Sequence, residues 1–191
     1  MEIGINMMTD ILTMGKNART ASRSLGKLGT NKKNEVLLAV AEAIRANAGY
    51  ILEENHKDVE QGKADGMKSG LLDRLTLTKA RIDGMADGVN QVAGLDDPVG
   101  EVLSMKKRPN GLLIGKKRVP FGVIAVIYES RPNVTLDTFG LCFKTGNAVI
   151  LKGGSDAINS NIAIANVIRE ALKANGIDEN ALQLIESTDR E

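Results

Sequence analysis

Thiols and imidazoles are nearly missing from this chain of 191 residues, which contains one cysteine, Cys142, and one histidine, His56. A single cysteine excludes an internal disulfide and fits a reducing compartment. The two side chains are too few for a zinc site, and one histidine leaves little material for a Ser-His-Asp triad. Cys142 lies in the middle of a helical pattern, so we expect a buried and unreactive thiol. His56 lies in a charged segment, where we expect a solvent-exposed side chain.

Long apolar runs and blocks of one charge are also missing. No run approaches the roughly 20 apolar residues of a membrane-spanning helix. The first ten residues lack the basic region and cleavage site of a secretory signal. The net charge is +1 and the longest basic clusters are triplets, which argues against nucleic-acid and membrane partners. We therefore expect a cytoplasmic protein that acts on a small molecule.

The segment 119–155 carries the clearest structural pattern. An apolar, β-branched run at 122–128 is followed by a polar turn at 129–133, an amphipathic segment that ends at Lys144, and a second apolar run at 148–151. This order predicts a strand, a helix and a second strand. The two apolar runs do not alternate with polar residues, which is typical of parallel strands buried on both faces and joined by a right-handed crossover.

Small and charged residues follow the second of these strands directly. Lys152, Gly153, Gly154 and Ser155 lie between the strand and a long helical pattern, and we expect Ser155 to cap that helix. A helix N-terminus, free backbone N–H groups and one cation favour an anion. We expect that anion to be a nucleotide phosphate.

Helical patterns dominate the chain on both sides of this segment. They predict a first helix over 7–28 and a second, long one from Thr30 or Asn31 to Leu52. Loops with short helical pieces are expected at 55–70, and a helix capped by Thr78 should run to Gly94. After Ser155 we expect a helix that ends at Asn175-Gly176 and a third parallel strand over 181–185.

A β-hairpin is predicted over 101–119, around Asn110-Gly111, because both of these residues tolerate positive φ. Its polar, basic sequence indicates an exposed ribbon.

The expected fold is therefore α/β: N-terminal helices plus a small parallel Rossmann-like sheet, with a projecting hairpin. Three strands make an unusually small sheet. We expect a fragment of a longer protein, or a chain that depends on a partner surface.

Two stretches resemble one family of enzymes: RVPFGVIAVIYESRPNVTLD and LCFKTGNAVILKGGSDA. They are similar to the gamma-glutamyl phosphate reductases of the aldehyde dehydrogenase superfamily. The resemblance continues through LLDRLTLTKARIDGMADGVNQVAGLDDPVG and NKKNEVLLAVAEAI, and so covers nearly the whole chain. It implies that residues 1–191 form an incomplete N-terminal NADP-binding domain. The catalytic domain, with its nucleophilic cysteine, would lie outside this chain.

The resemblance also implies an activity and an assembly. Such enzymes use NADPH to reduce L-glutamyl 5-phosphate to L-glutamate 5-semialdehyde and phosphate in proline biosynthesis. The hairpin at 101–119 would be the arm of a homo-oligomer. An alternative is a stand-alone nucleotide-binding or assembly module without catalytic activity.

For the cofactor, the resemblance implies that Lys152 contacts the adenosine ribose. Many members follow this lysine with Pro-Ser-Glu, and a glutamate there would repel a 2′-phosphate. Ser155 removes that repulsion, worth on the order of 1–4 kcal/mol, and so favours NADP(H) over NAD. The sequence lacks the G-x-G-x-x-G fingerprint, which these enzymes do not use. The expected cofactor-binding residues are Lys152, Gly153, Gly154, Ser155, Tyr128, Glu129 and Ser130.

The turn before the expected helix carries the candidate catalytic side chains. Members of the superfamily place an asparagine amide against the oxyanion here, and either Arg131 or Asn133 could take that place. Asn133 could instead cap the helix. Arg131 could meet the substrate phosphate, or pair with Glu129 on the surface. The sequence leaves these alternatives open.

Overall fold

A computed structural model describes residues 2–188, with side chains described from Ile11 onward. Seven α-helices, two short 3₁₀ turns and five strands are present in that part of the chain. The helices are α1 (Glu2–Leu25), α2 (Thr30–Ala46), α3 (Ala48–Ala64), α4 (Ser69–Leu75), α5 (Lys79–Gly94), α6 (Asn133–Lys144) and α7 (Ile158–Ala174). The strands are β1 (Val102–Lys107), β2 (Leu113–Lys117), β3 (Val123–Ile127), β4 (Ala148–Lys152) and β5 (Leu182–Leu184), and the 3₁₀ turns are η1 (Ser155–Ala157) and η2 (Glu179–Ala181).

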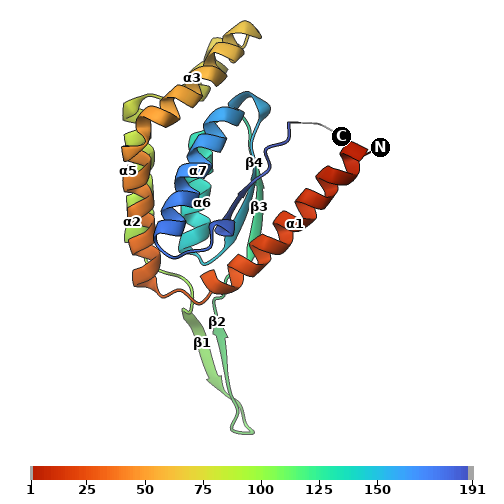
Figure 1. Cartoon of the computed structure of the whole chain (residues 1–191). Helices are drawn as coiled ribbons and strands as arrows, with labels where there is room; N and C mark the ends of the chain where they lie inside the picture. The colour runs from red at the N-terminus through yellow and green to blue at the C-terminus, as the bar shows by residue number, and fades with distance from the viewer. Residues whose placement is uncertain (1, 189–191) are drawn as a thin grey trace.

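A three-stranded parallel sheet in the order β3-β4-β5 organises the molecule. Helix α1 covers one face, α6 and α7 cover the other, and α2 and α5 form a further layer on α6 and α7 (Figure 1). The predicted α/β class and the βαβ unit are confirmed. None of the helices in the described residues is long and apolar enough to cross a membrane.

The two strands of the βαβ unit differ in burial. Strand β4 lies in the middle of the sheet and is largely buried, as predicted. Strand β3 lies at an edge, and Ile127 at its end is 85% exposed. The expectation that both strands are buried on both faces is therefore wrong for β3, because an edge strand has a neighbour on one side only.

The N-terminal helices depart from the prediction in two places. The expected helix to Leu52 is broken at Asn47, where α3 begins in a new direction (Figure 1). The expected loops over 55–70 are mostly helix, because α3 continues to Ala64 and α4 follows. Two polar side chains of this segment, Asn55 and Asp58, are 2% and 3% exposed. Their burial explains why a polar sequence forms a packed helix.

The predicted hairpin is present, as β1 and β2 pair in antiparallel fashion and project from the body (Figure 1). Its turn differs from the expected one. Gly111 alone has a positive φ, +86°, whereas Asn110 does not. The Gly111 N–H donates to the Arg108 carbonyl at 2.9 Å, with Pro109 between them at a turn position that proline favours. The Asn110 side chain accepts from the Leu112 N–H at 3.1 Å and holds the turn closed.

A buried ion pair fixes the start of α2 to the segment after α5. The Lys33 ammonium lies 2.8 Å from the Asp97 carboxylate, and the two side chains are 1% and 8% exposed. The Thr30 hydroxyl and the Val99 N–H also donate to Asp97, each at 3.0 Å. Burial alone would raise the pKa of Asp97, but the bonds from Lys33, Val99 and Thr30 outweigh it, so the pKa is lowered.

This lowered pKa predicts an acid-sensitive contribution to stability. The folded-state pKa of Asp97 is below the unfolded value of about 3.9, so the unfolded state binds the proton more readily. The contribution is complete above pH 3.9 and is lost as the pH falls through the folded-state pKa. We expect the Asp97→Asn variant to lose less stability than the native chain between pH 5 and pH 3, measured by urea unfolding. Equal losses in both proteins would contradict this.

Candidate functional site

The carboxyl edge of the parallel sheet brings three segments of the chain together. Tyr128 follows β3, Lys152 ends β4, and Ser187 lies just beyond β5. The Lys152 ammonium donates to the Ser187 carbonyl at 2.6 Å, and the Tyr128 N–H donates to the Lys152 carbonyl at 3.0 Å. The lysine predicted at the strand end therefore lies at the expected edge, half-buried and tied to the chain after β5.

A row of side chains behind this edge explains one of the predicted glycines. The Tyr128 and Thr135 hydroxyls lie 2.6 Å apart, and Thr135 donates to the Asn161 side chain at 2.9 Å. Burial raises the pKa of Tyr128, although the bond to Thr135 opposes it, so this phenol remains protonated. A Cβ on Gly153 would lie 2.3 Å from the Asn161 amide nitrogen and 3.2 Å from the Tyr128 ring. Close packing against these two side chains requires a glycine here.

The Gly153→Ala variant should therefore be less stable, by about 1–3 kcal/mol, because overpacking forces neighbouring side chains to shift. The additional change Asn161→Ala should recover part of the loss by removing the closest atom. Gly49→Ala in α3 is the matched control, because a Cβ there meets no atom within 4 Å. Chemical denaturation measures all three. A native-like stability of Gly153→Ala would show that the backbone can move freely at this edge.

The start of α7 differs from the prediction. Ser155 begins η1, its side chain is exposed, and no side chain within η1 or α7 caps either element. The expectation that Ser155 caps the long helix is wrong. Instead Asp58 of α3 accepts from the backbone N–H groups of Asn159 at 3.2 Å and Ser160 at 2.8 Å. The helix N-terminus that we expected to meet a phosphate is therefore closed by a carboxylate of the chain itself.

A second carboxylate lies beside the predicted cofactor residues. Ser130 donates its hydroxyl to Asp156, and this bond joins the loop after β3 to the loop after β4. A Cβ on Gly154 would lie 2.5 Å from an Asp156 carboxylate oxygen, so the missing side chain gives Asp156 its place. Asp58 and Asp156 were not predicted as part of the site. Their partners are 101 and 26 residues away, so no local pattern indicates them.

The residues at this edge fit a ribose phosphate in part. Lys152 supplies a cation and Ser155 an exposed hydroxyl, whereas Gly153 between them is buried and Gly154 is half-buried. Glu129 is exposed in the facing loop. Together these groups could hold one sugar and one phosphate of a dinucleotide, with Lys152 as the contact that favours negative charge.

Arg131 and Asn133 lie at the beginning of α6. The helix starts at Asn133 itself, and the Asn133 amide donates to the Asp137 carboxylate at 2.9 Å. The alternative of Asn133 as a side-chain cap is therefore wrong. Among the ion pairs of the described residues, none involves Arg131, so the alternative of a pair with Glu129 is wrong as well. Arg131 instead lines a cavity.

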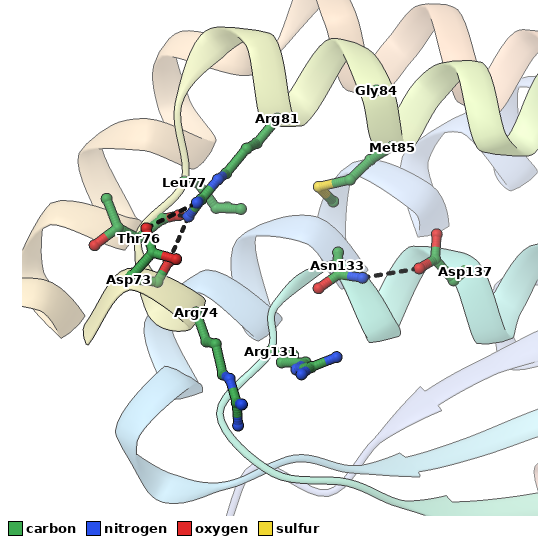
Figure 2. A pocket seen from close by; sticks show the side chains of 10 residues that line it. All are labelled: Asp73, Arg74, Thr76, Leu77, Arg81, Gly84, Met85, Arg131, Asn133 and Asp137. Carbon is green, nitrogen blue, oxygen red and sulfur yellow. Dashed lines mark hydrogen bonds and ion pairs between the residues drawn. The ribbon is translucent and has the colours of Figure 1, made fainter. Parts of the chain in front are cut away.

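This cavity, of about 380 Å³, lies between α4, α5 and the start of α6 (Figure 2). Ten residues line it: Asp73, Arg74, Thr76, Leu77, Arg81, Gly84, Met85, Arg131, Asn133 and Asp137.

The three arginines of the cavity differ in their partners. Arg81 pairs with Asp73 at 2.8 Å and donates to the Thr76 carbonyl at 2.7 Å, so it is part of the wall. Arg74 and Arg131 have no acidic partner among the described residues, and Figure 2 shows them together on the side opposite Met85. Two unpaired guanidinium groups in one cavity are suited to anions such as phosphate or carboxylate. Arg74 lies in a stretch that the resemblance covers, but no pattern there distinguishes it from a surface arginine.

The single cysteine has no place in this chemistry. Cys142 is 6% exposed in the core, and burial raises the pKa of its thiol to about 11. At neutral pH almost none of it is thiolate, the nucleophilic form. The prediction of a buried, unreactive thiol is confirmed, and His56 is exposed on α3 as expected.

Comparisons with known proteins show which proteins this chain and its fold are similar to. The gamma-glutamyl phosphate reductase of Lachnospira eligens is 60% identical over 183 residues, which cover 96% of this chain and 44% of that protein. The enzyme of the same name from Caldanaerobacter subterraneus subsp. tengcongensis is 56% identical, over 95% of this chain and 44% of its own length. A crystal structure of gamma-glutamyl phosphate reductase from Thermotoga maritima superimposes with a TM-score of 0.91 at 47% identity, over 94% of this chain and 43% of that one.

The chain thus spans less than half the length of these relatives. A sequence model of the aldehyde dehydrogenase family matches residues 7–191. The chain belongs to the aldehyde dehydrogenase family.

Proposed function

We propose that this chain is the NADP-binding part of an enzyme that reduces L-glutamyl 5-phosphate to L-glutamate 5-semialdehyde and phosphate, in the cytoplasm and as a step of proline biosynthesis. The observation that carries the proposal is the cavity with unpaired Arg74 and Arg131. Arg131 lies in the loop that follows β3, at the same carboxyl edge of the sheet where Lys152 ends β4. An acyl phosphate substrate brings negative charge to such a cavity. The names of the relatives support the same reaction.

In this proposal the residues of the site bind the cofactor or stabilise negative charge on the substrate. Lys152 and Ser155 hold the ribose of NADPH. Because residue 155 is a serine and not a glutamate, no carboxylate repels the 2′-phosphate there. The bound cofactor supplies the hydride. Arg131 faces the negative charge of the phosphate or of the oxyanion. Asn133 has committed one N–H to Asp137, which leaves its second N–H as the alternative oxyanion donor.

Calorimetric titration of the chain with NADPH and NADH tests the cofactor part. We expect NADPH to bind more tightly, and we expect Lys152→Ala to weaken binding about tenfold because it removes a charge-assisted contact. The matched control is Lys173→Ala, an exposed lysine on α7 that pairs with Glu170 and Glu179. Equal affinity for both cofactors, or an equal loss in both variants, would contradict the proposal.

The reaction is tested in reverse, by NADPH formation from glutamate 5-semialdehyde, phosphate and NADP⁺. The chain alone should show no turnover, because its only cysteine is buried. Joined in one polypeptide to the remaining part of the Lachnospira eligens relative, it should become active. Turnover by the chain alone, or an inactive but folded chimera, would overturn the proposal.

The hairpin supports a second candidate, a module that assembles with copies of itself. Six of its apolar side chains are between 44% and 60% exposed: Val102, Leu103, Met105, Leu112, Leu113 and Ile114. A two-stranded ribbon is marginal alone and gains stability from a partner. We propose that residues 101–119 pair with a second copy of the chain.

Sedimentation over a range of concentrations measures this association. Leu113→Glu should shift the chain to the monomer, whereas Lys106→Glu, at another exposed position of the same hairpin, should have a smaller effect. A monomer at all concentrations would exclude the assembly. Assembly without NADPH binding would favour the stand-alone module over the enzyme.

A further inference from the structure

We infer that the cavity between α4, α5 and α6 binds the substrate and recognises its α-amino group, with the Asp137 carboxylate as the group that contacts the ammonium. The inference rests on the proposed function and extends it, because it names which part of the substrate the cavity distinguishes. The ligand class is an α-amino acid with a second anionic group on its side chain.

Asp137 is a half-buried carboxylate without a cationic partner. It projects from the second turn of α6 into the cavity (Figure 2), where one carboxylate oxygen accepts the Asn133 amide at 2.9 Å. None of the ion pairs within residues 11–188 involves Asp137. Burial raises its pKa, and the bond from Asn133 only partly opposes this. A half-buried carboxylate with a free oxygen is stabilised by a bound cation.

The charges of the cavity match those of one kind of ligand. Arg74 and Arg131 offer two unpaired guanidinium groups, and Asp137 offers one unpaired carboxylate. L-Glutamyl 5-phosphate carries two anionic groups, the α-carboxylate and the phosphate, and one cationic group, the ammonium. A simple aldehyde or acyl phosphate would leave Asp137 unpaired. The cavity therefore favours the amino acid over a substrate that lacks the ammonium.

Two glycines of α5 lie near the cavity or the Asp137 carboxylate. Gly84 lines the cavity, and a Cβ there would meet no atom within 4 Å. A Cβ on Gly88, one turn later, would lie 3.9 Å from the free oxygen of Asp137. Glycine inside a helix is unfavourable relative to alanine, and close packing does not require it at Gly84, where a Cβ would meet no atom within 4 Å. The absent side chain of Gly84 leaves room for a ligand in the cavity.

The test is an NMR titration of the ¹⁵N-labelled chain with L-glutamate and with glutarate, which is the same molecule without the ammonium. We expect L-glutamate to shift the amides around Asn133 and Asp137 and to bind about tenfold more tightly than glutarate. Asp137→Asn should abolish this preference and leave the affinity for glutarate equal or higher. Asp83→Asn on α5 removes the same charge outside the cavity and should retain the preference.

A second variant distinguishes a loss of ligand binding from a folding defect. Gly84→Val fills the cavity without changing its charge, and should weaken both ligands while the amides of the sheet keep their positions. The inference is overturned if neither ligand binds saturably, if both bind equally to the native chain, or if Asp137→Asn weakens both alike. Selective binding of L-glutamate with an inactive chimera would retain the inference and refute the proposed reaction. An active chimera without this selectivity would refute the inference and retain the proposed reaction.

Discussion

Arg131→Gln should lower kcat/KM for the phosphate-dependent reaction of the chimera by about 10²–10³-fold, the range seen when one group that stabilises transition-state charge is removed. The side chain has no acidic partner within the described residues, so its charge is available to the substrate. Glutamine is a shorter but still polar side chain, and it removes the charge. The measurement is initial rates of NADPH formation at varied phosphate and semialdehyde concentrations.

Arg131→Lys separates charge from geometry. Lysine keeps the charge but cannot form the planar, two-pronged contact of arginine, so we expect an intermediate rate. Arg108→Gln is the matched control, because Arg108 lies in the hairpin turn and should not affect the rate of the chemical step. An unchanged kcat/KM in Arg131→Gln would assign the anion contact to Asn133 or Arg74 instead.

Asp58→Ala should lower the free energy of unfolding by about 2–4 kcal/mol. The carboxylate is 3% exposed and accepts four hydrogen bonds at the start of α7. They come from the backbone N–H and side-chain amide of Asn159, at 3.2 and 2.8 Å, and from the N–H and hydroxyl of Ser160, at 2.8 and 2.5 Å. Alanine would leave these donors buried without acceptors, which adds a desolvation cost to the loss of a helix cap.

Urea unfolding followed by circular dichroism measures the loss. Glu53→Ala, on the exposed side of the same helix, is the control and should change stability by less than about 0.5 kcal/mol. Asp58→Asn should lie between the two, because an amide oxygen can still accept from some of the donors. A loss as small as that of the control would mean that water replaces the carboxylate at the helix start.

The sheet could be predicted because its signals are local. Apolar runs separated by a helical pattern gave β3, α6 and β4, and Gly146 ends α6 with a φ of +75°. The break at Asn47 could not be predicted, because the apolar stripe continues through it. Both helices pack on α7, but α2 also packs closely on α5, whereas α3 also packs on α4. The helix over 55–64 was missed for a related reason, since Asn55 and Asp58 satisfy their polar groups with distant residues.

The candidate site, like the fold, could be predicted only where its signals are local. The place of Lys152 follows from the end of a strand, and that of Arg131 from the turn before a helix. Which side chains face each other does not follow, because the contacts of Asp156 and Asp58 join separate segments of the chain. The pair of Asn133 and Asp137 did carry a signal, since residues four apart share one face of a helix.

The first two turns of α6 serve both halves of the site. Thr135 supports Tyr128 and Asn161 behind the cofactor edge, while Asn133 and Asp137 face the cavity. One helix thus joins the edge proposed to bind the cofactor to the cavity proposed to bind the substrate. A substitution that tilts α6 would leave the cofactor and the substrate able to bind separately. In the proposed reaction it would slow the transfer of hydride between them.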